Sequence, residues 1–212
     1  MEIVWLGHAC FRLRGKEATV VTDPYAKSLG IGMPRVTADI VTVSHDDPHH
    51  NHVAGVAGSP KVVDGPGEYE IGGVAITGVR TYRDKQKGAT RGKNTSYLIH
   101  IDELKVCHLG DLGHLLSADQ IDVLKEVDVL LLPVGGHCTI GASEAAEVIS
   151  QLEPRIVIPM HYWVDGIAVP LDRLDKFLRE MGIKDAQPQP RLSVTASNLP
   201  DEPTTVVLEM RS

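Results

Sequence analysis

Residues 43–52 read VSHDDPHHNH and hold four of the ten histidines in the chain. They directly follow residues 39–43, an apolar run that predicts a β-strand. Two aspartates, Asp46 and Asp47, lie among the histidines. Imidazoles and carboxylates on a loop at a strand end can be aimed at one divalent cation. This segment therefore predicts a sheet that carries a metal site at one edge.

Two other strand ends repeat this pattern. His108 and Asp111 come at and after the end of a β-type run at residues 104–107, and His161 follows an apolar run at residues 156–159. The glycine before Asp111 lets the backbone pass close to a site, and the carboxylate there could bridge two cations. We therefore expect the three strand ends to meet at a shared edge.

The order of the expected elements indicates an α/β fold. Strands are expected at residues 2–6, 10–14, 18–22, 39–43, 61–63, 74–79, 96–101 and 104–108, and the first three suggest an antiparallel start. Helices at 117–127, 142–152 and 171–181 then alternate with strands at 128–132, 155–158 and 204–209. This alternation predicts helices packed on sheet faces. Residues 1–212 are expected to form one domain, with residues 185–203 as a loop.

Composition limits the binding partners and the cellular location that can be expected. The formal net charge of −7 and the pI near 5.8 argue against broad electrostatic capture of nucleic acid. No apolar run approaches the roughly 20 residues needed to cross a bilayer, and the N-terminus does not resemble a signal peptide. Three scattered cysteines favour a reducing compartment. We expect a cytoplasmic protein with a small-molecule substrate and no membrane or nucleic-acid partner, and a homo-oligomer is compatible with the sequence.

One basic segment departs from this acidic background. Residues 80–94 contain a single acidic residue, Asp84, and six basic ones: Arg80, Arg83, Lys85, Lys87, Arg91 and Lys93. A run of this kind is most often a solvated loop. If it lies over the metal edge instead, it forms a cationic lip that attracts an anionic substrate.

Seven short motifs together resemble the metallo-β-lactamase superfamily, in particular the branch that includes ascorbate-6-phosphate lactonase-like enzymes. They are WLGHA at residues 5–9, VTDP at 21–24, VSH at 43–45, GPGEY at 65–69, HLGD at 108–111, LPVGG at 132–136 and IPMHY at 158–162. The resemblance runs nearly end to end. It implies a four-layer αββα sandwich, with two β-sheets face to face, helices outside and a metal site at one sheet edge.

The first cluster departs from the pattern of that superfamily. There it reads His, any residue, His, any residue, Asp, His, whereas here Asp47 stands at the second His and His49 at the Asp. The superfamily usually supplies a further His between this cluster and the Gly-Asp motif, but residues 53–99 contain no His. His8 and His137 are candidate substitutes, and the lactonase-like branch keeps a His at the position of His8.

The resemblance and the residues together give the expected site. The metal ligands are expected to be His8, His45, Asp47, His49, His50, Asp111 and His161, and catalytic roles are assigned to Asp47, His49 and Asp111. Asp23 is expected to orient one of the histidines. The expected metal is Zn²⁺, as one or two ions, with Mn²⁺ or Fe²⁺ as alternatives.

The expected activity is metal-dependent hydrolysis. The substrate would be an ester, lactone, amide or phosphoester of a small anionic molecule, attacked through a metal-bound hydroxide. The alternative is a catalytically silent binding protein that keeps the fold and has lost part of its metal site. A nuclease ranks last, because the chain is acidic overall and no added RNA-binding domain is apparent.

Overall fold

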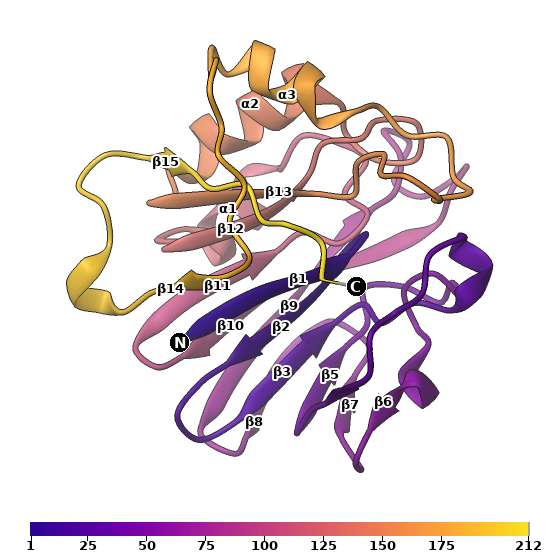
Figure 1. The fold of residues 1–212 in the computed structure, drawn as a ribbon, viewed down its shortest axis with the longest axis vertical. Helices are drawn as coiled ribbons and strands as arrows, with labels where there is room; N and C mark the ends of the chain where they lie inside the picture. Colours follow the sequence, from indigo (N-terminus) through magenta and orange to yellow (C-terminus); the bar gives the residue numbers. More distant parts are fainter. Residues whose placement is uncertain (212) are drawn as a thin grey trace.

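Two β-sheets pack face to face in the computed structural model, which describes residues 1–211 (Figure 1). The first sheet contains, in order, β14 (Leu192–Ser193), β1 (Glu2–Gly7), β2 (Cys10–Arg14), β3 (Thr19–Thr22), β5 (Ile40–Thr42) and β7 (Lys61–Val63). The second contains β15 (Thr204–Thr205), β13 (Ile156–Met160), β12 (Val129–Pro133), β11 (Leu104–His108), β10 (Lys93–Ile101), β9 (Val74–Tyr82) and β8 (Gly67–Ile71). β4 (Val36–Thr37) pairs separately with β6 (Val56–Ala57). Of the expected domain, only Ser212 lies outside the described residues.

The first sheet has apolar side chains on both faces. Along β1, Ile3 and Trp5 belong to the core between the sheets, whereas Val4 and Leu6 belong to a second cluster on the outer face. This division follows from the two-residue period of a strand. Loops and two short 3₁₀ helices, η1 (Lys27–Leu29) and η2 (Val53–Gly55), lie near this outer face, and Leu29 joins its cluster.

The second sheet is covered by the α-helices. Every residue of β12 is buried, as expected for a strand that pairs in parallel on both sides and is covered on both faces. α2 (Ala142–Leu152) buries Ala145, Val148 and Leu152. Figure 1 shows α2 and α3 (Leu174–Glu180) beyond β12 and β13, on the side away from β3 and β5. The expected sandwich of two sheets with helices outside is therefore confirmed, although loops and 3₁₀ helices rather than α-helices form the outer layer of the first sheet.

Most expected elements are present, with shifted ends. The helix expected at 117–127 is α1 (Ala118–Leu124), which begins after Ser117, because the Ser117 Oγ accepts from the Gln120 N–H at 3.4 Å. It ends where Lys125 takes up an extended conformation. The third helix is likewise shorter than 171–181.

Four strands were not expected, namely β4, β6, β8 and β14. No element was expected at β8, which is an edge strand that exposes Glu68 and Glu70. Residues 185–203 were interpreted as a loop, yet they contain β14, where Ser193 pairs with Glu2. Two residues are too few for a strand period to show in the sequence. The final strand ends at Thr205 rather than at residue 209.

The sheet directions bring several strand ends to one edge of the sandwich. β1, β3 and β5 run in the same direction, since β2 is antiparallel to both β1 and β3, and β3 is parallel to β5. β11, β12 and β13 are parallel in the second sheet. The segments that follow these carboxyl ends carry the side chains described next. No helix in the described part of the chain is long and apolar enough to span a bilayer.

Candidate metal centre

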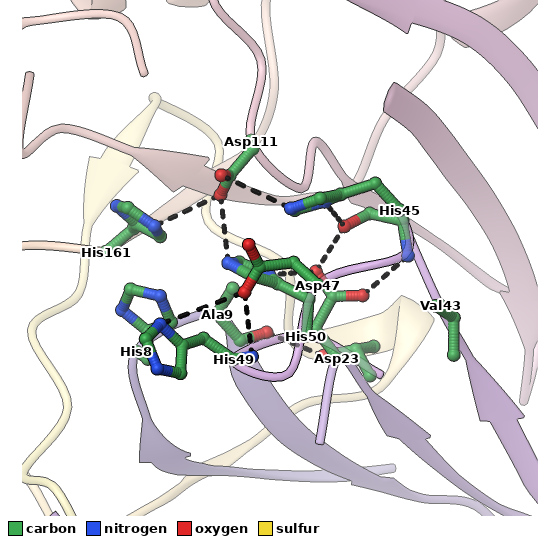
Figure 2. Close-up of polar contacts among 12 residues, drawn as sticks. His8, Ala9, Asp23, Val43, His45, Asp47, His49, His50, Asp111 and His161 are labelled. Atoms are coloured by element: carbon green, nitrogen blue, oxygen red, sulfur yellow. Dashed lines mark hydrogen bonds and ion pairs between the residues drawn. The ribbon is translucent and has the colours of Figure 1, made fainter. Parts of the chain in front are cut away.

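Five of the expected ligands converge at this edge (Figure 2). His8 lies in the turn between β1 and β2, while His45 and His50 lie in the loop after β5. Asp111 follows β11, and His161 follows β13. His8, His50 and His161 have ring nitrogens within 4.8 Å of one another, and so have ligand atoms of His45, His50 and Asp111. Strands from both sheets therefore supply one cluster.

Asp111 is the centre of this cluster. Its side chain is 1% exposed, and its Oδ1 lies 3.1 Å from His161 Nε2 and 3.3 Å from His50 Nε2. Its Oδ2 lies 3.6 Å from His45 Nε2 and 3.1 Å from a terminal nitrogen of Arg83. One carboxylate thus faces three imidazoles and a guanidinium.

Asp23 orients two of the imidazoles. It is fully buried, and its Oδ2 lies 2.8 Å from His50 Nδ1. The same oxygen accepts the Ser44 hydroxyl at 2.6 Å, and that hydroxyl lies 3.0 Å from His45 Nδ1. Partners on both Nδ1 atoms turn both Nε2 atoms toward Asp111, which is how a carboxylate behind a histidine fixes its tautomer at a metal site. Asp23 therefore lies behind a histidine of the cluster, as the sequence predicts.

His8 and His161 are held against each other. The His8 carbonyl accepts the His161 N–H and the Trp5 indole N–H, both at 3.0 Å. The two rings have centroids 3.9 Å apart. Both residues have left-handed backbones, with φ of 52° at His8 and 54° at His161. Such conformations cost free energy in a non-glycine residue, and they concentrate at functional sites.

Gly110 allows the close approach of the Asp111 loop. Its φ is 57°, and a Cβ added there would lie 2.5 Å from the Ser44 Cβ. The next residue, Asp111, donates its N–H to Asn94 Oδ1 at 3.0 Å. The expectation that a glycine here serves a close backbone approach is confirmed.

Burial and the neighbouring charges set the protonation states. Burial works to raise the pKa of Asp111, but the facing His50 and His161 outweigh it and hold that pKa well below its usual range. Burial lowers the pKa of His8 well below its usual value and that of His45 to about 4. Burial also works to lower the pKa of His50, but Asp111 outweighs it and the pKa is raised. Carboxylate and neutral imidazole are the forms that bind a metal ion, so metal binding at His50 would compete with a proton.

The donor atoms of the cluster fit a divalent cation. His8 Nδ1, His45 Nε2, His161 Nδ1 and Asp111 Oδ1 are buried without a hydrogen-bond partner among the described residues. His50 Nε2 and His161 Nε2 lie close to Asp111 Oδ1 but are not aligned for hydrogen bonding with it. A buried polar atom left unpaired is costly, so such a group of atoms calls for a ligand. Imidazole nitrogens and a carboxylate are the donor set that zinc and similar cations take.

Two expected ligands lie at the rim rather than in the cluster. The side chains of Asp47 and His49 are 33% and 27% exposed, and they pair with each other at 3.8 Å. Asp47 Oδ1 also accepts the His49 backbone N–H at 2.9 Å. Neither residue belongs to the groups whose donor atoms lie within 4.8 Å of one another, whereas Cys138 does, with Asp111 and His161. His137 is exposed and belongs to none of these groups.

The ion pair between Arg83 and Asp111 was not expected from the sequence. Arg83 was considered only as part of a basic lip, yet it pairs with Asp111 from the end of β9. It also lines a cavity of about 520 Å³ beside the cluster, together with Ser44, His45, Asp46, Asp64, Arg80, Gly88, Arg91, Gly92, Lys93 and Thr95. The one available signal was its position, within the span where the superfamily has another His.

The model of the β-lactamase superfamily domain matches residues 2–161, which include all five converging residues. This chain belongs to the metallo-β-lactamase superfamily. A UPF0173 metal-dependent hydrolase from Thermoplasma volcanium is 30% identical, over 76% of this chain and 83% of its own. A UPF0173 protein from Pyrococcus furiosus is 31% identical, over 85% of this chain and 90% of its own.

A solved structure from the same superfamily is also similar. It is a Thermotoga maritima protein described as a candidate Zn-dependent hydrolase, and it is 39% identical with a TM-score of 0.81. The alignment covers 98% of this chain and 97% of that one. The fold and the superfamily inferred from the sequence are thus confirmed together.

Proposed function

We propose that this chain is a metal-dependent hydrolase of small anionic molecules. The observation that carries the proposal is the set of buried, unpaired donor atoms around Asp111. A bound divalent cation would supply Lewis-acid chemistry there, by lowering the pKa of water and polarising a substrate oxygen. Zn²⁺ is the first choice for this donor set, with Mn²⁺ and Fe²⁺ as alternatives.

The protein's own residues divide the remaining work. His8, His50, His161 and Asp111 would hold the cation, and Asp23 keeps His50 in one tautomer by accepting from its Nδ1 at 2.8 Å. His45 keeps a free Nε2 on the side of the cavity, where it can accept a proton.

Asp47 and His49 stand at the rim of the centre. Their exposure suits groups that meet solvent and substrate. In this proposal they complete the ligand set, or shuttle protons, when substrate covers them.

The adjoining cavity supports an anionic substrate. Arg80, Arg83, Arg91 and Lys93 line it, against Asp46 and Asp64. A guanidinium can hold a carboxylate or phosphate through two parallel hydrogen bonds. An ester, lactone, amide or phosphoester that carries such a group fits this lining, and a phosphorylated lactone would fit a place in the lactonase-like branch.

The catalytically silent alternative is less favoured. A protein that no longer binds metal has no reason to keep unpaired imidazole nitrogens buried beside a carboxylate. The similar Thermoplasma protein is also named a metal-dependent hydrolase. A cytoplasmic location belongs to the proposal too, because Cys10, Cys107 and Cys138 are free thiols, as in a reducing compartment.

Hydrolysis assays after metal removal and reloading test the proposal. The chain would be stripped with a chelator, reloaded separately with Zn²⁺, Mn²⁺ or Fe²⁺, and assayed with p-nitrophenyl acetate, p-nitrophenyl phosphate and a phosphorylated lactone. We expect hydrolysis only after reloading, with a loss of roughly 100-fold or more in His161→Ala. His100→Ala is the matched control, because His100 is exposed on β10. Hydrolysis that survives chelation, or that His161→Ala leaves unchanged, contradicts the proposal.

A further inference from the structure

The two oxygens of Asp111 face different surroundings. Oδ1 faces His50 and His161, at 3.3 and 3.1 Å, and the His8 ring lies against the His161 ring. Oδ2 faces His45 and Arg83, at 3.6 and 3.1 Å. The Oδ1 side thus presents imidazoles to the carboxylate, whereas the Oδ2 side already holds a positive charge.

A second cation on the Oδ2 side would have to lie close to this charge. It would bind Asp111 Oδ2 and His45 Nε2 at about 2 Å from each. Since the Arg83 nitrogen is 3.1 Å from Oδ2, that cation would lie no more than about 5 Å from the guanidinium. Arginine does not lose its proton in proteins, so the repulsion cannot be relieved by deprotonation. The Oδ2 side is therefore unsuited to a dication.

Arg83 is fixed in place by its own loop. Its backbone N–H donates to the Gly92 carbonyl at 3.1 Å, and its side chain donates to the Arg91 carbonyl at 3.3 Å. The carboxylate of Asp84, the next residue, accepts four backbone N–H groups of the same loop, from Gln86, Gly88, Thr90 and Arg91. A restrained loop of this kind holds the guanidinium near Asp111.

We propose that the centre takes a single divalent cation, on the Oδ1 side of Asp111, and that the Arg83 guanidinium stands in for a second cation on the Oδ2 side. The inference rests on the proposed function, because it takes the metal centre as given. Arg83 neutralises Asp111 and faces the cavity, where its remaining N–H groups pair with the anionic group of the substrate. Arg83 also lies within residues 53–99, the span in which the superfamily has a further His and this chain has none.

Metal stoichiometry tests this directly. Zn²⁺ bound per chain would be measured by calorimetric titration and by elemental analysis after desalting. We expect one ion in the parent protein and two in Arg83→His, which removes the fixed charge and adds an imidazole. Arg83→Lys, which keeps the charge, is expected to bind one ion, and circular dichroism would verify that each variant is folded.

Two further variants locate the single ion. His161→Ala is expected to weaken its binding at least tenfold, because His161 faces Oδ1. His45→Ala is expected to change it less than threefold, because His45 faces Oδ2.

The outcomes separate this inference from the proposed function. Two ions in the parent protein, or one in Arg83→His, contradict the role of Arg83 and leave the metal centre standing. An equal loss in His45→Ala and His161→Ala contradicts the position of the ion. No bound ion in any variant contradicts the proposed function, and with it this inference.

Discussion

Replacing Asp23 by asparagine isolates the role of the carboxylate behind the histidines. The Asp23 carboxylate accepts the Ser44 N–H at 2.8 Å and the Ser44 hydroxyl at 2.6 Å, and it lies 2.8 Å from His50 Nδ1. Asparagine has the same shape, but it has no charge, and one of its two terminal atoms is a donor. The change therefore leaves the packing intact and removes a charge-assisted hydrogen bond.

The expected loss can be estimated in two independent ways. A hydrogen bond to a charged group contributes about 1.5–3 kcal/mol. Removing the partner that orients a metal-bound histidine typically lowers metal affinity by about 10–100-fold, which corresponds to about 1.4–2.7 kcal/mol. The two ranges agree. We therefore expect the Zn²⁺ dissociation constant of Asp23→Asn to rise by about 10–100-fold.

Competition with a chromophoric chelator measures this dissociation constant. Asp39→Asn is the matched control, because Asp39 is exposed and accepts a backbone N–H, from Thr19 at 2.8 Å, without contacting a histidine. We expect the control to bind Zn²⁺ as the parent does. If folded Asp23→Asn bound Zn²⁺ within twofold of the parent, the orienting role of Asp23 would be refuted.

Three further predictions concern the loop, the glycine and the metal. Backbone N–H groups, that of Arg91 foremost, hold the pKa of Asp84 below its usual range. Their restraint of the loop is therefore present above the ordinary carboxyl pKa and is lost as the pH falls through the lowered pKa. At neutral pH, Asp84→Asn should speed tryptic cleavage after Lys87 and Arg91, and an unchanged rate would show that Asp84 does not restrain the loop. Gly110→Ala should weaken Zn²⁺ binding at least tenfold, because the new Cβ would lie 2.5 Å from the Ser44 Cβ at a φ of 57°; parent-like affinity in titration would contradict this. Zn²⁺ at 100 times its dissociation constant should stabilise the fold by about 2.7 kcal/mol. For a chain of this size, that stabilisation raises the melting temperature by roughly 5–11 °C. A melting curve that Zn²⁺ does not move would argue against a metal site in the folded state.

Much of the fold and part of the centre followed from the sequence. His45, Asp111 and His161 each come after an apolar strand, and strands that run in the same direction bring such positions to one edge. The strands β7 and β11 and the helix α2 were expected with the bounds that the structure has. Local patterns of apolar residues and turns were sufficient for these features, because each depends on neighbouring residues.

The remaining features depend on contacts between distant segments. Arg83 reaches Asp111 across 28 positions of the chain, and no local pattern indicates where its guanidinium lies. The rim positions of Asp47 and His49 result from the path of the loop after β5, where Asp47 accepts the His49 N–H. β14 forms only because its backbone meets β1 from the other end of the chain. Tertiary contacts decided each of these outcomes.

Anomalous diffraction from crystals grown with Zn²⁺ tests the metal centre most directly. Data collected on both sides of the zinc absorption edge would locate every bound ion. We expect one peak, within about 2.3 Å of Asp111 Oδ1 and of ring nitrogens from His8, His50 and His161. A peak bound elsewhere, or none at this cluster, would contradict the assignment of these residues as a metal centre.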